Sequence, residues 1–155
     1  MFYRYRFESE IYPTLRLIPL HVRMKLDLTG VKISLKHWLA FGLEERSVLC
    51  HLPVVTKEES KVFCSYLDFL LQRYFGEGAP RGASVINPPW EDPSRVPESV
   101  QARSKETGQT VTAQEWARWD PCQRYALFKL SNAKNEPEQF FAALREFRET
   151  SGNPS

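Results

Sequence analysis

The side chains that could do chemistry in this chain are its three histidines, its three cysteines and two pairs of neighbouring carboxylates. The best candidate for a nucleophile is Cys50, which precedes His51, with Cys64 further along the chain. Neighbouring residues on a helix point about 100° apart, so Cys50 and His51 do not face each other. Cys64 lies on the apolar side of an expected helix. This position favours a buried structural thiol over a catalytic one.

A metal site made of the same two cysteines and His51 has no recognised ligand spacing, and it lacks a fourth ligand. The carboxylate pairs Glu44-Glu45 and Glu58-Glu59 stand at expected helix starts, where the helix dipole favours negative charge. Neither HExxH, GxSxG, GxGxxG nor a Walker A pattern occurs in the sequence. We therefore expect no catalytic, metal-binding or cofactor-binding residue.

The segment INPPWEDP is less well explained by folding alone. Proline lowers the entropy lost on binding, and tryptophan is a common interface hot spot. These properties predict a partner-binding loop that uses Asn87, Pro88 and Trp90. The alternative is that Trp90 folds back and fills the seam between two helical modules. Under the first interpretation, Trp90→Ala weakens partner capture and leaves the thermal transition unchanged; under the second, it disrupts folding.

The N-terminal residues 1–15 alternate between apolar and charged side chains, which predicts an edge strand or an extended arm. An arm with aromatic and basic side chains could stack on single-stranded nucleic acid. The alternation favours instead a half-buried strand with its arginines outward. Arg4 and Arg6 therefore join the predicted partner-binding surface.

Composition and charge exclude several classes of protein. The chain has 155 residues, of which 42% are hydrophobic and 13% aromatic, so a folded core is expected rather than disorder. It has 21 basic and 19 acidic residues, whereas nucleic-acid-binding proteins usually carry a basic excess. No apolar run approaches about 18 residues, so no membrane span is expected. An odd number of cysteines and the absence of a signal peptide fit the reducing cytoplasm, and homodimer formation stays open.

The second half of the chain repeats the first. Residues 18–70 align with residues 96–148 at a constant offset of 78, with eleven identities over 53 positions, where chance gives about three. The aromatic and leucine positions that repeat, among them Phe69/Phe147, are predicted to be core positions. The repeated arginines Arg46 and Arg124 are predicted to form buried pairs with carboxylates.

Local signals predict where the helices of each copy begin and end. Proline suits a first helical position, glycine suits the left-handed residue that ends a helix, and Ser, Thr and Asp suit the N-cap. The predicted boundary residues are Pro19, Gly30, Ser34 and Thr56 in the first copy and Pro97, Gly108, Thr112 and Asp120 in the second. Long helices are expected over 57–75 and about 136–149.

We therefore predict a mainly α-helical protein with a short extended N-terminal arm and at most tiny strands. Two helical repeat modules, residues 18–75 and 96–149, are expected to pack about a pseudo-twofold axis into one core. A loop rich in proline and glycine, residues 76–95, joins them, and the chain 1–155 is expected to form a single domain.

An ordered series of residues continues along nearly the whole chain, roughly 1–148. It includes Arg16-Leu17-Ile18-Pro19, Trp38, Asn87-Pro88 with Trp90, Trp116 and Gln123-Arg124. This series resembles the nitrate reductase-associated protein family, best represented in cyanobacteria.

The resemblance implies a non-catalytic accessory or maturation factor for an assimilatory nitrate reductase that contains molybdenum and iron–sulfur centres. Its partner would be the nitrate reductase polypeptide, and it would carry no cofactor of its own. The alternative is a small ligand-binding or enzymatic domain with a pocket between the two modules.

Overall fold

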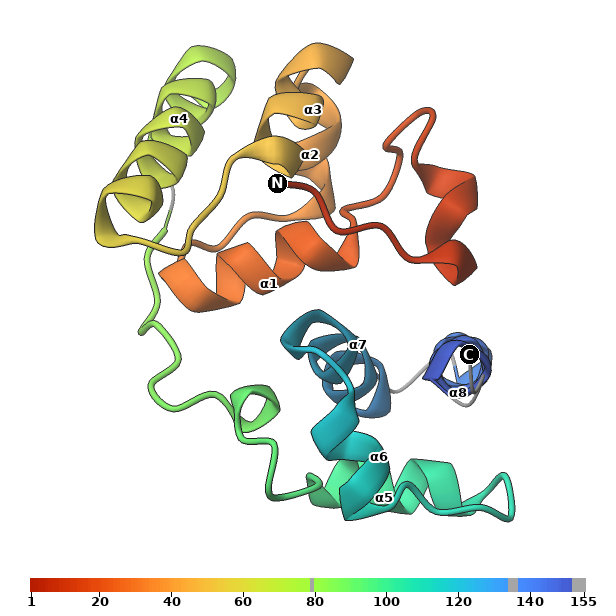
Figure 1. Ribbon diagram of the computed structural model, residues 1–155. Helices are drawn as coiled ribbons and strands as arrows, with labels where there is room; N and C mark the ends of the chain where they lie inside the picture. Colours follow the sequence, from red (N-terminus) through yellow and green to blue (C-terminus); the bar gives the residue numbers. More distant parts are fainter. Residues whose placement is uncertain (79, 134–136, 152–155) are drawn as a thin grey trace. The chain divides into compact units, whose positions relative to one another are not determined.

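The computed structural model describes residues 1–78, 80–133 and 137–151 (Figure 1). These residues are mainly α-helical, which confirms the predicted fold class. They divide into two compact units. Unit 1 consists of Met1–Arg4 and Glu8–Ile86, and unit 2 consists of Tyr5–Phe7 with the described residues from Asn87 onward. The assignment of the whole chain to a single domain stays a prediction.

Unit 1 is built from α-helices joined by short turns. They are α1 (Leu20–Thr29), α2 (Leu35–Ala40), α3 (Leu43–His51) and α4 (Lys57–Phe75), and α1 contacts α3. A 3₁₀-helix, η1 (Arg6–Ile11), precedes them, and its first two residues belong to unit 2. An isolated β-bridge joins Val31 to Arg81, and no strand occurs over the described ranges. The expectation of at most tiny strands is thus confirmed.

Unit 2 has the same order of helices after a short 3₁₀-helix. Its elements are η2 (Pro89–Glu91), α5 (Glu98–Lys105), α6 (Ala113–Arg118), α7 (Pro121–Ser131) and α8 (Pro137–Ser151). The helix α7 contacts η2, α5 and α8, and it occupies the middle of this unit (Figure 1). The described residues of the loop predicted over 76–95 are irregular except for η2 and the bridge at Arg81.

Side-chain caps explain where the helices begin. Ser34, Thr56, Thr112 and Asp120 each accept the backbone N–H three residues later, at 2.8–3.3 Å. In each case the side chain at that third residue accepts the N–H of the cap in return, which forms a capping box. The predicted N-caps are therefore confirmed.

Glycine ends α1, as predicted, because no other residue fits there. Gly30 has φ +77°, in the left-handed region, and a Cβ atom at this position would lie 2.6 Å from the carbonyl oxygen of Gly82. Gly108, which follows α5, has φ +83°, but a Cβ atom there would meet nothing within 4 Å. Both glycines meet a conformational requirement, and Gly30 also permits a close backbone approach.

A tryptophan and an arginine fasten α2 and α3 to the segment that precedes α1. The indole N–H of Trp38 donates to the carbonyl of Leu15 at 2.7 Å, and the guanidinium of Arg46 donates to the same carbonyl at 2.9 Å. Arg46 also donates to the carbonyl of Phe41 at 3.2 Å. The predicted pairing of Arg46 with a carboxylate is wrong, because its described partners are backbone carbonyls that helix ends leave open.

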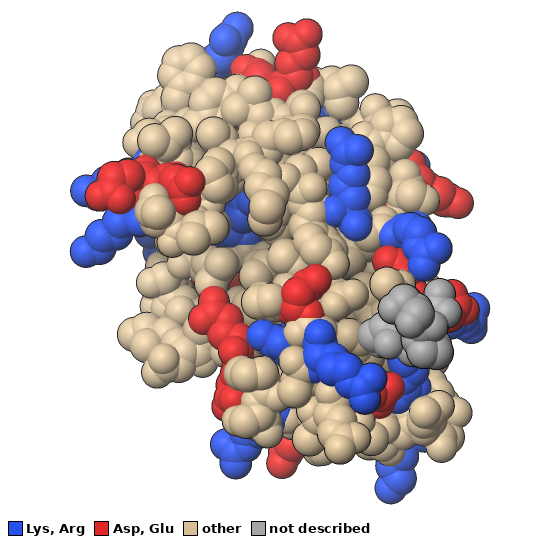
Figure 2. Space-filling view, in the orientation of Figure 1, with Lys and Arg blue, Asp and Glu red and all other residues tan. Residues whose placement is uncertain are grey.

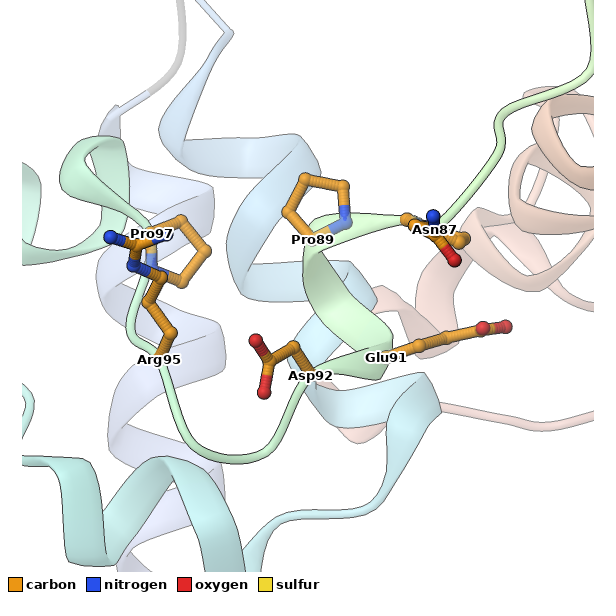
Figure 3. A pocket seen from close by; sticks show the side chains of 7 residues that line it. Asn87, Pro89, Glu91, Asp92, Arg95 and Pro97 are labelled. Atoms are coloured by element: carbon orange, nitrogen blue, oxygen red, sulfur yellow. The ribbon is translucent and has the colours of Figure 1, made fainter.

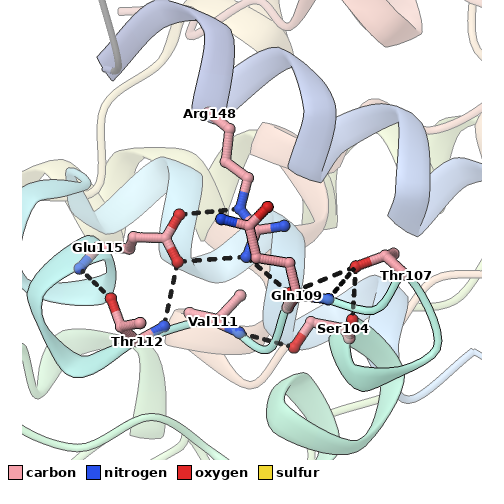
Figure 4. A network of polar contacts seen from close by, with 7 residues as sticks. All are labelled: Ser104, Thr107, Gln109, Val111, Thr112, Glu115 and Arg148. Carbon is pink, nitrogen blue, oxygen red and sulfur yellow. Dashed lines mark hydrogen bonds and ion pairs between the residues drawn. The ribbon is translucent and has the colours of Figure 1, made fainter.

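In unit 2 a half-buried ion pair joins α6 to α8 (Figure 4). The guanidinium of Arg148 donates to the two carboxylate oxygens of Glu115 at 2.8 and 3.2 Å, and to the carbonyl of Gln109 at 2.9 Å. Burial raises the pKa of Glu115, but the hydrogen bonds from Arg148 and from the backbone N–H of Thr112 outweigh it and bring the pKa below its usual value. The pair holds the turn before α6 against α8.

The buried side chains of α4 and α8 follow the same spacing, but one residue away from the register that the predicted repeat gives. In α4 the buried side chains include Phe63, Leu67 and Leu70, and in α8 they include Phe140, Leu144 and Phe147. These positions correspond at an offset of 77, not 78. Phe69, predicted to be a core residue paired with Phe147, is instead 56% exposed.

The first 15 residues form neither a strand nor a fully extended arm. The carboxylate of Glu8 accepts the N–H of Leu20 at 2.9 Å and the hydroxyl of Tyr12 at 2.7 Å. Through these bonds Glu8, a residue of η1, holds the N-terminal segment against the start of α1. The alternating pattern was therefore a wrong indicator for residues 6–11.

The described helices include none with the length and apolar character needed to cross a bilayer. On the face shown in Figure 2, basic and acidic side chains of the described residues lie interspersed. This mixture agrees with the nearly balanced charge of the sequence.

Candidate functional site

Cys50 and His51 serve different structural roles. The side chain of Cys50 is fully buried, and burial raises the pKa of its thiol to about 12. The Nδ1 atom of His51 lies 2.8 Å from the carbonyl oxygen of Ser47, one turn earlier on α3. The thiol is therefore protonated at neutral pH, as expected for a structural cysteine. Over the described ranges no group of three or more His, Cys, Asp or Glu side chains is arranged to hold a metal ion.

The other two histidines also bind backbone groups. His37 accepts the N–H of Ser34 at 3.1 Å and so completes the cap of α2. His21 accepts the N–H of Tyr3 at 2.9 Å through Nδ1. Burial, followed by the charge of Lys25, lowers the pKa of His21 to about 4. His21 is therefore neutral at physiological pH and able to accept this bond.

The loop predicted to bind a partner forms an open hollow of about 550 Å³ in unit 2 (Figure 3). Its lining residues are Asn87, Pro88, Pro89, Glu91, Asp92, Arg95 and Pro97. Two of the predicted partner-binding residues, Asn87 and Pro88, thus lie together in one concave surface. In Figure 3 the carboxylates of Glu91 and Asp92 extend to opposite sides of η2.

The backbone of this loop is fastened to the rest of unit 2 at two carbonyl groups. The Nε of Arg124, on α7, donates to the carbonyl of Trp90 at 2.6 Å. The indole N–H of Trp116, on α6, donates to the carbonyl of Asp92 at 2.8 Å. Arg124 also donates to the carbonyl of Trp119. The loop is therefore preorganised, because both fastening side chains are buried.

Arg124 was predicted to pair with a carboxylate, and this prediction is wrong. Its described hydrogen bonds go to backbone carbonyls. Asp120 and Glu91 act on Arg124 only through their charge, which raises its pKa, whereas burial lowers the pKa and has the larger effect. Sequence reasoning missed its role in holding the loop. The recurrence of an arginine at Arg46 and Arg124 was the signal, since both arginines bind the carbonyl of the residue five positions earlier.

Trp90 lies beneath the loop rather than on its surface. Its side chain is 2% exposed, and its ring packs against Tyr125 and Phe128 with centroid distances of 4.8 and 5.5 Å. Its indole nitrogen is buried and has no hydrogen-bond partner. A surface anchor must be exposed before binding, so Trp90 supports the loop from inside unit 2. Its predicted contribution to partner binding can only be indirect in this conformation.

The side chains that rim the hollow are exposed and mixed in charge. The carboxylate of Asp92 accepts the hydroxyl and the backbone N–H of Ser94 at 2.6 and 2.9 Å, and these bonds lower its pKa. Glu91 and Arg95 are exposed beside it. Asn87 has φ +52°, a left-handed conformation that asparagine tolerates better than most residues. The hollow thus presents an amide, two carboxylates and a guanidinium on a proline-stiffened backbone.

The two arginines of the predicted arm belong to different units. Arg4, in unit 1, is exposed and its guanidinium lies 5.2 Å from the ring centroid of Phe2. Arg6, in unit 2, has an exposed side chain, and its backbone N–H donates to the carboxylate of Glu146 at 3.1 Å. Partner binding by these arginines stays a prediction.

Comparison with known proteins identifies the family. A search of curated proteins finds no match, and neither does a search of solved structures. A family model described as conserved nitrate reductase-associated protein matches residues 4–147. This span includes the hollow and all the described helices apart from the end of α8. The resemblance found in the sequence is therefore confirmed, and the chain belongs to the nitrate reductase-associated protein family.

Proposed function

We propose that this protein is a non-catalytic accessory or maturation factor that binds a molybdenum- and iron–sulfur-containing nitrate reductase. The observation that carries this proposal is the family match over residues 4–147, since the family is described by its association with nitrate reductase. The docking surface that we propose is the hollow over 87–97.

The geometry of the hollow supports a role in protein binding. Its backbone is held by buried donors at Trp90 and Asp92, so little conformational entropy is lost when a partner docks. Asn87 and Arg95 offer hydrogen-bond donors at opposite sides of the hollow, while Glu91 adds an acceptor (Figure 3). A surface with this mixture suits the polar rim of a transient protein–protein interface.

The mechanism that we propose is a shift in the population of reductase conformations. A protein that binds the cofactor-receptive form of the reductase more tightly than its other forms raises the fraction of that form. The accessory protein then contributes binding energy and no chemical step.

We also propose that the two units are copies of one helical module. In both, an indole donates to a carbonyl of the segment before the first helix, and an arginine donates to the carbonyl five residues earlier. The residue ranges of α2 and α6 differ by 78 positions at both ends. The buried residues of α4 and α8 differ by 77 positions. The predicted packing about a pseudo-twofold axis stays a prediction.

Capture of the reductase from a lysate of nitrate-grown cells tests the function. The immobilised protein is compared with a loop variant, Asn87→Gly with Arg95→Gln, and nitrate reductase is detected with a specific antibody. Glycine keeps the left-handed backbone of residue 87, so the variant removes side-chain groups without straining the loop. Lys105→Gln is the matched control, because Lys105 is an exposed residue of α5 and its replacement also removes one positive charge.

We expect the loop variant to capture about tenfold less reductase than the wild type, because a tenfold loss of affinity is typical when one interface hot spot is removed. The control should retain the wild-type amount. If the wild-type protein captures no reductase, the proposed partner is wrong. Equal capture by the loop variant and the control would leave the partner in place and remove the hollow as its docking surface.

A further inference from the structure

In unit 1 a single carboxylate joins an aromatic ring to the first turn of α1. Glu8 accepts the hydroxyl of Tyr12 through Oε1 at 2.7 Å and the backbone N–H of Leu20 through Oε2 at 2.9 Å. Leu20 is the first residue of α1, so its N–H has no acceptor inside the helix. The N-cap is Pro19, whose side chain cannot accept a hydrogen bond, and Glu8 therefore takes the place of a capping side chain.

The same groups recur in unit 2, 78 positions later, without the carboxylate. The N-cap of α5, Pro97, has φ −60° and ψ 145°, against −60° and 149° for the N-cap of α1, so the two helices begin alike. Trp90 stands where unit 1 has Tyr12, and its ring also carries a hydrogen-bond donor at its edge. The position of Glu8 is held by Ile86, whose side chain is 84% exposed and cannot accept a hydrogen bond.

Two donors of unit 2 are therefore left without an acceptor. The indole nitrogen of Trp90 is buried and has no hydrogen-bond partner. The N–H of Glu98, the first of α5, donates to no group within the part of the chain that the structure describes. The hollow lies beside both residues, because its lining includes their chain neighbours Pro89, Glu91 and Pro97. A helix N-terminus carries partial positive charge, so the missing acceptor is best supplied by an anion.

We propose that the hollow binds a glutamate or aspartate side chain of the partner polypeptide, whose carboxylate takes the place that Glu8 occupies in unit 1. This carboxylate accepts the N–H of Glu98 and the indole N–H of Trp90. The inference deepens the proposed function by naming what docks at the hollow, and it rests on that function for the identity of the partner, the reductase.

The positive charge at the hollow also favours a carboxylate. In unit 1 burial raises the pKa of Glu8, while its hydrogen bonds and then the charge of Arg23 lower it. The residue at the position of Arg23 in unit 2 is Gln101, and Arg95 instead brings a positive charge to the lining of the hollow. The guanidinium of Arg95 is exposed and forms no hydrogen bond over the described ranges. It can therefore pair with an incoming carboxylate.

The acidic side chains of the hollow do not satisfy the two open donors themselves. In Figure 3 the carboxylate of Glu91 extends to the side of η2 away from that of Asp92. Asp92 accepts the hydroxyl and the N–H of Ser94, both through Oδ1. These bonds, and then the positive charges of Arg95 and Arg124, lower the pKa of Asp92. The two guanidiniums thus offset the charge of Asp92, and the place of the missing carboxylate stays open to a partner.

Nuclear magnetic resonance of the full-length, ¹⁵N-labelled protein tests the site without the reductase. The probe is Nα-acetyl-glutamate α-amide, whose only charge is its side-chain carboxylate, and the control is Nα-acetyl-glutamine α-amide, which is neutral and of the same shape. Loss of a signal in Trp90→Phe identifies the indole N–H of Trp90. We expect the glutamate probe to shift this signal and the N–H signal of Glu98 saturably, with a Kd at least about tenfold below that of the glutamine probe. The inference is overturned if neither signal shifts or if the two probes have the same Kd.

Charge substitutions at Arg95 show whether the reductase supplies the carboxylate. Capture from the lysate is compared for the wild type, Arg95→Gln and Arg95→Glu, with Lys105→Glu as a control that makes the same change of charge at an exposed residue of α5. We expect Arg95→Glu to capture about tenfold less reductase than the wild type, Arg95→Gln to lie between them, and the control to match the wild type.

The other outcomes separate this inference from the proposed function. Stronger capture by Arg95→Glu would show that the partner brings a cation, and equal capture by all variants would show that its charge is not read at the hollow. Either result overturns the inference and leaves the reductase as the partner. If the wild type captures no reductase, the proposed function fails, and the titration with the glutamate probe alone decides whether the hollow is a carboxylate site.

Discussion

The same substitution, tryptophan to phenylalanine, should have very different effects on stability at the two buried positions Trp90 and Trp116. Both belong to unit 2, and their side chains are 2% and 0% exposed. The indole N–H of Trp116 donates to the carbonyl of Asp92 at 2.8 Å, whereas that of Trp90 has no partner. Replacement by phenylalanine removes the same atoms at both positions. The difference in the free energy of unfolding between the variants therefore isolates the hydrogen bond.

The magnitudes follow from the two environments. The smaller ring loses about 1.5 kcal/mol of buried apolar contact at either position. In Trp116→Phe the carbonyl of Asp92 also loses its donor, which adds about 1–2 kcal/mol and gives a total of about 2.5–3.5 kcal/mol. In Trp90→Phe the removal of an unpaired buried N–H recovers about 1 kcal/mol or more. This variant should therefore lie within about 1 kcal/mol of the wild type.

Urea unfolding followed by far-UV circular dichroism measures both values without relying on the fluorescence of the replaced residue. Since both substitutions fall in unit 2, they report on the same transition, and the slope with denaturant should not change. Equal losses of stability at the two positions would refute the reasoning. It would mean that the N–H of Trp90 finds a partner, such as a buried water, or that the bond to Asp92 contributes nothing.

Two further predictions concern backbone strain and pH. Gly30→Ala should cost about 1–3 kcal/mol more than Gly108→Ala in the same unfolding assay, because both residues have positive φ but only Gly30 has backbone atoms where the new methyl group would go; equal costs would contradict this. His21, whose pKa is lowered to about 4, stabilises the fold fully above its unfolded pKa of about 6.5, and this stability is lost as the pH falls toward 4. A loss of about 3 kcal/mol over that range is expected, with weaker protection of the Tyr3 N–H from hydrogen exchange, and His21→Gln should flatten the profile.

The helix boundaries could be predicted from sequence because their causes are local. A cap such as Thr112 and its partner Glu115 lie three residues apart, and a glycine such as Gly30 is required by the conformation of its own backbone. These signals do not depend on how distant parts of the chain pack. The family resemblance, too, rested on the order of residues along the sequence and not on how they pack.

The register of the last helix could not be predicted in this way. Phenylalanine is common in both helices, so a gapless comparison paired Phe63 with Phe141 and Phe69 with Phe147. In the pattern of buried residues Phe63 matches Phe140 and not Phe141. A shift of one residue turns a helix by about 100°, and only the identity of the neighbouring core reveals it.

The choice between an exposed and a buried Trp90 was also beyond local reasoning. A proline-rich segment is typical of an exposed loop, and the rings that cover Trp90 come from residues 35 and 38 positions later in the chain. The two interpretations of Trp90→Ala can now be separated. Loss of a fully buried indole costs about 3–5 kcal/mol, so this variant perturbs folding and cannot serve as a clean test of partner binding.

Tyr5–Phe7 completes the core of unit 2 although the residues on either side of it belong to unit 1. During synthesis the ribosome therefore releases Tyr5 long before its site exists, since Arg6 and Glu146 are 140 positions apart. Limited proteolysis within 76–86 should not liberate two intact halves. The C-terminal piece either stays bound to the N-terminal piece through Tyr5–Phe7 or exposes Phe147 and aggregates.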